Sequence, residues 1–173
     1  VMLMRRCPQP IIALIQGAAA GGGFALALAA DIRIATRNAR MNCAFIKLGL
    51  GGCDIGSSYF LPRLVGVSVA SELILTGRFI GAERALAVGL ISELVEEGGL
   101  EAAAEPYVDA MMTASPVGLR LSKECLNMSV DAGSIEAVIA MEDRNQVLCS
   151  RSEDFNEGIR AFLEKRKPVY IRR

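Results

Sequence analysis

The sequence predicts an α/β fold whose first half alternates strands and helices and whose second half is helical. A short apolar run rich in β-branched residues, 11–15, lies between Pro10 and Gly17 and is followed by three glycines and an apolar helix. From Glu101 onward, apolar residues recur at helical spacing almost to the end of the chain. The change falls at Gly98-Gly99, so we predict two regions, 1–98 and 99–173.

The elements of the first region follow from apolar patterning and from the glycines that interrupt it. Predicted strands are 11–15, which reads as buried on both faces, 31–35, a short edge strand at 40–43, and 90–95. Predicted helices begin at the glycine triplet and then cover 57–65, 68–76 and 82–88, with breaks at Gly66, Gly77 and Gly89. Asp31, between helix and strand, is expected to cap structure rather than to catalyse.

The second region is expected to hold helices over 101–113, 116–128, 134–149 and 152–166. Ser134 and Ser152 are suitable N-caps for the last two. The segment 137–141 is apolar on more than one helix face, which indicates that it needs a partner surface. Residues 1–6 read as the tail of a helix, and the chain is therefore expected to be a fragment, a truncated product or one piece of a cleaved protein.

The triplet Gly21-Gly22-Gly23 is the most informative feature for function. Glycines let a ligand approach the backbone, and the first N–H groups of the following helix can hold a developing negative charge. The alternative is a tight strand-to-helix crossover that only needs small residues. A phosphate loop is excluded because Phe24 and Ala25 follow, and a dinucleotide motif because Leu26 stands where its third glycine belongs.

Composition narrows the class of protein. The 173 residues are 52% hydrophobic with zero formal net charge, which argues against nucleic-acid binding, RNA included. No uninterrupted membrane-length apolar run is expected, since Gln16 and four glycines divide the most apolar window, 11–30. The chain has no histidine, which removes imidazole bases and the common zinc sites, so no metal is expected.

The cysteines and the basic clusters give weaker signals. Five cysteines without paired spacing fit a reducing, cytoplasmic compartment. Cys53 reads as a small hydrophobe, with a reactive thiol as the alternative. The basic clusters read as solvated faces or as anchors for phosphates; they are Arg5-Arg6, Lys165 to Lys167 and Arg172-Arg173.

Several segments, in order, resemble the enoyl-CoA hydratase/isomerase family, the crotonase superfamily. They are 12–17 with the glycine triplet, 26–27 with 30–35, 75–77 with 82–85 and 89–91, and 157–168. The likeness covers nearly all of this chain but only the C-terminal two-thirds of a family member, whose upstream segment has no counterpart here. It implies a partial ββα spiral core at 1–98, and a helical extension at 99–173 that contacts coenzyme A and forms trimers or dimers of trimers.

The resemblance also implies a site for an acyl-CoA thioester, with coenzyme A as part of the substrate and no separate cofactor. The N–H of Gly22 would polarise the thioester carbonyl in an oxyanion hole, beside Gly21 and Gly23. Phe162 and Lys165 match positions that reach coenzyme A in the family. Their alternatives are a packing residue for Phe162 and a cation in a helix's last turn for Lys165.

The acid/base positions depart from the family pattern. Hydratases carry glutamates where this chain has Ala25 and Phe45, and neither of these side chains can move a proton. Asp54 matches a proton-carrying aspartate of the dienoyl-CoA isomerases apart from a one-residue shift, and its alternative role is a helix N-cap. We therefore expect enolate chemistry, as double-bond isomerisation or an atypical hydration. The alternative is a non-catalytic acyl-CoA binder, an oligomer subunit or an inactive fragment.

Overall fold

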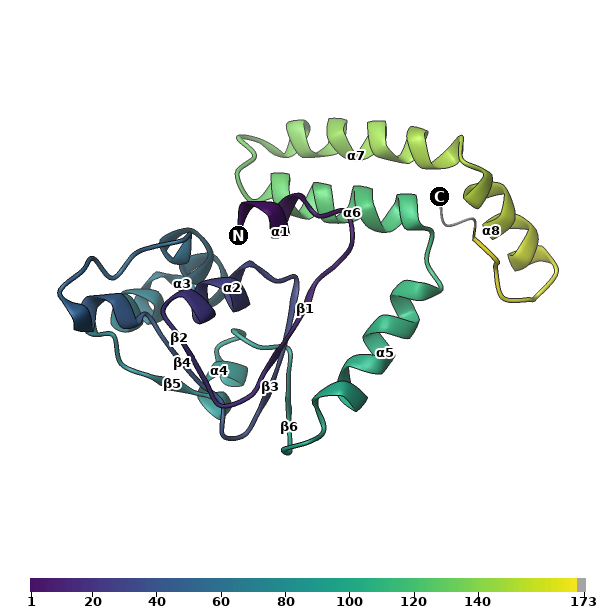
Figure 1. Cartoon of the computed structure of the whole chain (residues 1–173). Coiled ribbons are helices and arrows are strands. Elements are labelled where there is room, and N and C mark those ends of the chain that lie inside the picture. Colours follow the sequence, from purple (N-terminus) through teal and green to yellow (C-terminus); the bar gives the residue numbers. More distant parts are fainter. Residues whose placement is uncertain (171–173) are drawn as a thin grey trace. The chain divides into compact units, whose positions relative to one another are not determined.

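The computed structural model describes residues 1–170 and separates into two compact units (Figure 1). The N-terminal unit comprises Val1–Arg5 and Ile11–Glu105, and the C-terminal unit comprises Arg6–Pro10 and Pro106–Arg173. The division falls inside helix α5 (Leu100–Met112), whereas the sequence pattern changes at residue 98. The basic pair Arg172-Arg173 lies outside the described residues.

Two three-stranded sheets form the scaffold of the N-terminal unit. The first has the order β1 (Ile12–Ile15), β3 (Ile32–Thr36), β6 (Glu93–Val95), and all its pairs are parallel. The second has the order β2 (Ala18–Ala20), β4 (Arg40–Asn42), β5 (Ile80–Gly81), with β5 antiparallel to β4. Strand β1 leads directly into β2, and β3 leads directly into β4. Because β1 pairs with β3 and β2 pairs with β4, the second pair of strands lies alongside the first.

Helix α1 (Met2–Arg6) precedes the first strand. The helices that connect the strands are α2 (Gly22–Ala29), the 3₁₀ helix η1 (Ala44–Leu48), α3 (Ser57–Thr76) and α4 (Ala82–Ala87). Helix α3 is broken at Gly66, whose φ of 76° is not helical, and it ends at the left-handed Gly77. The fully buried side chains of the core come mainly from α2, α3 and the strands, with Leu90 from the loop before β6, and include Phe24, Leu28, Ile34, Met41, Leu61, Leu73 and Ile80.

Helix α3 has the length and composition of a membrane-crossing helix, which the sequence reading did not identify. Each half on either side of the Gly66 break is too short to span a bilayer. Leu61 and Leu73 are fully buried in the core, one in each half. Helix α3 thus contributes one face to the core of the N-terminal unit, while only 17% of its apolar window is buried.

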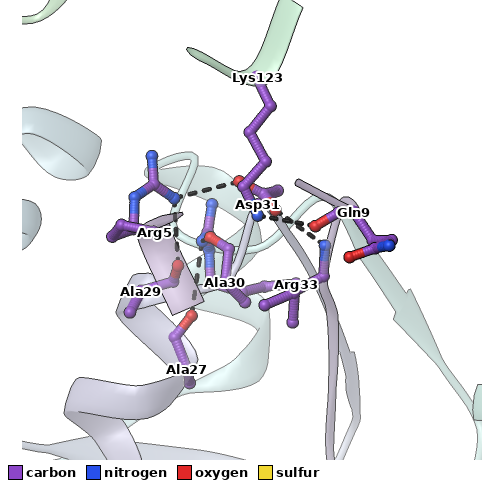
Figure 2. A network of polar contacts seen from close by, with 9 residues as sticks. Arg5, Gln9, Ala27, Ala29, Ala30, Asp31, Arg33 and Lys123 are labelled. Atoms are coloured by element: carbon purple, nitrogen blue, oxygen red, sulfur yellow. Dashed lines mark hydrogen bonds and ion pairs between the residues drawn. The ribbon is translucent and has the colours of Figure 1, made fainter. Parts of the chain in front are cut away.

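A polar network joins the start of β1 to the end of α2 (Figure 2). The Asp31 carboxylate accepts the Ile11 N–H at 2.8 Å and pairs with the Arg5 guanidinium at 3.1 Å. Arg5 also donates to the carbonyl of Ala29. Asp31 therefore has the structural role expected of it, although it holds the entry to a strand rather than a helix terminus.

The C-terminal unit contains the end of α5 together with α6 (Pro116–Ser129), α7 (Ile135–Ser150) and α8 (Glu153–Leu163). The expected serine caps are confirmed, since the Ser134 hydroxyl accepts from Ala137 N–H and the Ser152 hydroxyl from Phe155 N–H. Within this unit the Lys123 ammonium donates to the carbonyl of Gln9 at 2.9 Å.

Three expectations about elements need correction. The strand at 40–43 is not an edge strand, because β4 lies between β2 and β5. The strand expected over 90–95 begins only at Glu93, because the N–H groups of Leu90 and Ile91 donate to the carbonyl of Ala85 in α4 instead of to a neighbouring strand. The last helix ends at Leu163 rather than 166, because the backbone turns left-handed at Lys165.

Candidate functional site

The turn between β2 and α2 presents free backbone donors. Gly21 is the N-cap of α2 and its own N–H donates to the carbonyl of Asn42 at 3.0 Å. Its carbonyl accepts the first helical bond, from Ala25 N–H. Among the described residues, no acceptor meets the N–H groups of Gly22 and Gly23, as expected for a first helical turn without a side-chain cap.

The three glycines are not equivalent. Gly21 has a φ of 53°, and a Cβ there would lie 3.4 Å from the ring of Phe45, so the turn itself requires glycine. Gly22 and Gly23 lack a left-handed φ, and a Cβ on either would find open space or ordinary contact. The crossover alternative thus explains Gly21 but leaves two glycines that the fold does not require.

Phe45 contacts this turn from η1. The nearest ring atoms lie 3.4 and 3.5 Å from the Cβ position of Gly21, and Ala44 approaches the same position at 3.7 Å. Ala25, at the other position where the family carries glutamate, lies on α2 and is 1% exposed. Both positions are thus apolar. Ala25 is close to the turn along the chain, and Phe45 is close to it in space.

Asp54 lies exposed in the loop before α3. Its carboxylate accepts the N–H of Ile55 at 2.8 Å, and its own N–H donates to the Ser57 hydroxyl at 3.1 Å. The helix N-cap is Gly56, without a side-chain cap bond. The capping alternative for Asp54 is therefore wrong, because its carboxylate binds the next residue instead of the first helical turn.

Ile55 connects the Asp54 loop to the glycine turn, and sequence reasoning missed it. Its Cδ1 lies 3.7 Å from the Cβ position of Gly22. It has a φ of 51°, in the left-handed region that β-branched residues rarely adopt. No signal in the sequence marks an isoleucine for that conformation, so only the structure could identify it.

The cysteines near the site differ in character. Cys43 is buried, and desolvation raises the pKa of its thiol to about 11, with a smaller contribution from Cys53. Cys53 is exposed, so the expectation of a buried hydrophobe is wrong for it. Residues 1–170 contain no group of three or more cysteine and carboxylate side chains that could hold a metal ion.

Phe162 and Lys165 lie at the end of α8 in the C-terminal unit. Phe162 is 81% exposed, so its alternative role in packing within the described chain is wrong. Lys165 follows the helix with a φ of 52°, and Arg166 N–H returns to the carbonyl of Ala161 at 3.0 Å. This pattern is typical of a left-handed helix end, where glycine is the usual residue.

Acid is expected to release the segment after α8. The Glu157 carboxylate accepts from the Arg166 guanidinium and from Val169 N–H, and these bonds lower the pKa of Glu157 to about 2. Because this pKa lies below its unfolded value, the contribution to stability is complete above about pH 4.3 and disappears as the pH falls toward 2. Hydrogen exchange at Val169 N–H should therefore be protected at pH 5 and lost near pH 2.

Glu157→Ala is the control for this titration, and it should expose Val169 N–H already at neutral pH because the accepting oxygen is removed. Equal protection in the variant and the parent chain at pH 7 would contradict the assigned role of Glu157.

Comparison with known proteins places these features in context. The family model described as enoyl-CoA hydratase/isomerase matches residues 1–173. A probable enoyl-CoA hydratase of Mycobacterium tuberculosis is 40% identical over 171 residues, covering 98% of this chain and 60% of the relative. A 1,2-epoxyphenylacetyl-CoA isomerase of Escherichia coli is 37% identical over 98% of this chain and 64% of its own length.

Solved structures agree with the sequence relatives. A putative enoyl-CoA hydratase from Streptomyces coelicolor superposes with a TM-score of 0.93 at 37% identity, over 99% of this chain and 62% of that structure. A probable enoyl-CoA hydratase/isomerase from Mycobacterium abscessus gives a TM-score of 0.90 at 37% identity, over 96% and 65% respectively. The chain thus spans less than two-thirds of the length of these relatives.

Proposed function

Because this chain belongs to the enoyl-CoA hydratase/isomerase family, we propose that it binds an acyl-CoA thioester at the β2–α2 turn and stabilises the enolate of that thioester. One observation carries the proposal. The N–H groups of Gly22 and Gly23 have no acceptor among the described residues, and the fold does not require glycine at either position. Space and free donors are what a thioester carbonyl needs to approach a backbone closely.

In the proposed reaction the Gly22 N–H donates to the thioester oxygen as a base removes the α-proton. Negative charge then moves onto that oxygen, where a preorganised donor contributes about 3 kcal/mol to the transition state. In the family, a second donor comes from upstream of the matched segments. Gly21 supplies no donor, because its N–H is bonded to Asn42.

Apolar side chains at positions 25 and 45 favour isomerisation over the usual hydration. Hydration needs one group to activate water and another to protonate carbon. Isomerisation only moves one proton from one carbon to another, and a single carboxylate can do this. Asp54 is the proposed proton carrier, because the side chain of its neighbour Ile55 borders the open space beside Gly22, 3.7 Å from where a Cβ there would lie.

The role of Asp54 predicts a specific loss. Asp54→Asn should lower the rate at which butyryl-CoA exchanges its α-protons in D2O by about a hundredfold or more, since the amide cannot accept the proton. Proton NMR of the thioester measures the rate. Binding of butyryl-CoA should stay within a few fold of the parent chain, and exchange at the parental rate would exclude Asp54 as the base.

A second candidate function is acyl-CoA binding without catalysis. It is favoured by the apolar residues at 25 and 45 and by the engagement of the Asp54 carboxylate with Ile55 N–H. This function predicts binding of butyryl-CoA with no α-proton exchange in either the parent chain or Asp54→Asn.

Self-association through the C-terminal unit is part of the proposal. Large apolar side chains on α6 to α8 are more than two-thirds exposed, namely Leu126, Ile135, Phe162 and Leu163. Such surfaces are typical of protein interfaces, and we propose that copies of this chain cover them. Sedimentation equilibrium should give the mass of three or six chains, whereas a single 18.4 kDa species would contradict it.

A further inference from the structure

Ile55 occupies a conformation that its side chain disfavours. A φ of 51° is unusual for any residue with a Cβ and exceptional for a β-branched one. The next residue, Gly56, has a φ of 90°, so glycine is used where the chain needs this region. Isoleucine at position 55 therefore has a cost that glycine would avoid.

Burial in the core does not compensate for this conformation, because Ile55 remains 45% exposed. One hydrogen bond holds the residue, since its N–H donates to the Asp54 carboxylate at 2.8 Å. Its Cδ1 lies beside the glycine turn, 3.7 Å from where a Cβ on Gly22 would be. Only this placement of the terminal methyl group depends on the identity of the side chain.

Phe45 and Ile55 therefore bracket consecutive residues of the turn. The Phe45 ring borders the space beside Gly21, and the Ile55 δ-methyl borders the space beside Gly22, at 3.4 and 3.7 Å from where a Cβ on each glycine would lie. An acyl group whose carbonyl reached the Gly22 N–H would place its first carbons beside these two apolar side chains. Apolar walls at that position favour hydrocarbon and disfavour a polar substituent, which would lose its hydrogen bonds to water.

We propose that Ile55 is a specificity-determining residue that limits the acyl groups bound here to unbranched, apolar ones, with its δ-methyl as the boundary beside the α-carbon. This inference rests on the proposed acyl-CoA binding and adds the class of acyl group. One methyl group in an apolar pocket typically changes discrimination between substrates by ten- to a few hundredfold.

Ile55→Val tests the boundary, because valine lacks the contacting δ-methyl but keeps the β-branch and its conformational cost. Dissociation constants are measured by calorimetry for butyryl-CoA and for 2-methylbutyryl-CoA, which is branched at the α-carbon. The parent chain should prefer the straight acyl group, and Ile55→Val should reduce that preference about tenfold. Ile55→Gly should reduce it further and raise the melting temperature, because the left-handed strain is removed.

Val67→Ala is the matched control, since Val67 is an exposed apolar residue of the same unit at 72% exposure. Its preference should equal that of the parent chain. An unchanged preference in Ile55→Val, with the parent chain binding butyryl-CoA, would overturn the role of Ile55 alone. Absence of binding by the parent chain would overturn the proposed function and this inference together.

Discussion

Gly22→Pro is expected to lower the α-proton exchange of butyryl-CoA by 10²- to 10³-fold, about 3 to 4 kcal/mol, while the fold is kept. Proline removes the backbone N–H that is proposed to hold the enolate oxygen. Proton NMR in D2O measures the exchange, and circular dichroism measures the fold.

Position 22 is suited to this test because it is the first residue of α2. Proline is favoured at the first helical position, where its missing N–H has no helical partner in any case. Gly22→Ala is the matched control, because it adds a Cβ and keeps the donor. The new methyl would meet only Ile55 Cδ1, at 3.7 Å.

The two variants should therefore differ in exchange and agree in stability. Gly22→Ala should lose less exchange than Gly22→Pro, because its Cβ narrows the approach to the backbone but its N–H donor is kept. It should be as stable as the parent chain or more so, because alanine is the better helix former. Equal exchange rates in Gly22→Pro and Gly22→Ala would show that the Gly22 N–H holds no charge in the reaction.

Arg33→Met is expected to destabilise the protein by about 3 kcal/mol or more. The Arg33 guanidinium is buried at 7% exposure and donates to the carbonyls of Leu90 and Ala30 at 2.7 Å, with Ala27 at 3.5 Å. Figure 2 shows it reaching the end of α2 from the strand. Methionine fills similar space but leaves these buried carbonyls without their donor.

Urea unfolding followed by circular dichroism measures this loss. Desolvation, followed by repulsion from Arg5, lowers the pKa of Arg33. Arg37→Met is the control, because Arg37 pairs with Glu83 and Glu96 on the surface and its loss should leave the transition almost unchanged. A transition in Arg33→Met that coincides with that of the control would contradict the structural role.

The sequence predicted the elements where local pattern and tertiary context agree. The helix after the glycine triplet, the break at Gly66 and the serine caps of α7 and α8 are present where expected. Strand β3 shows the limit of such reasoning. The pattern predicted a strand at 31–35 but not the burial of Arg33, because its guanidinium is held by the carbonyl of Leu90, 57 residues away, as well as by that of Ala30.

The candidate site was predictable only in part. Glycine spacing identified the turn, but it could not separate Gly21, which the backbone requires, from Gly22 and Gly23, which it does not. The bond from Ile55 N–H to the Asp54 carboxylate and the contact of Ile55 with Gly22 depend on a left-handed residue that no propensity favours. Such exceptions to local preference are expected at functional sites.

The measurement that tests the central claim most directly is the amide NMR shift of Gly22 and Gly23 during titration with butyryl-CoA. Free coenzyme A is the control, because it lacks the thioester carbonyl. We predict that the Gly22 N–H proton moves downfield with butyryl-CoA and not with coenzyme A, as its free donor gains an acceptor. Binding of butyryl-CoA without a change at Gly22 would contradict the proposed function of this turn.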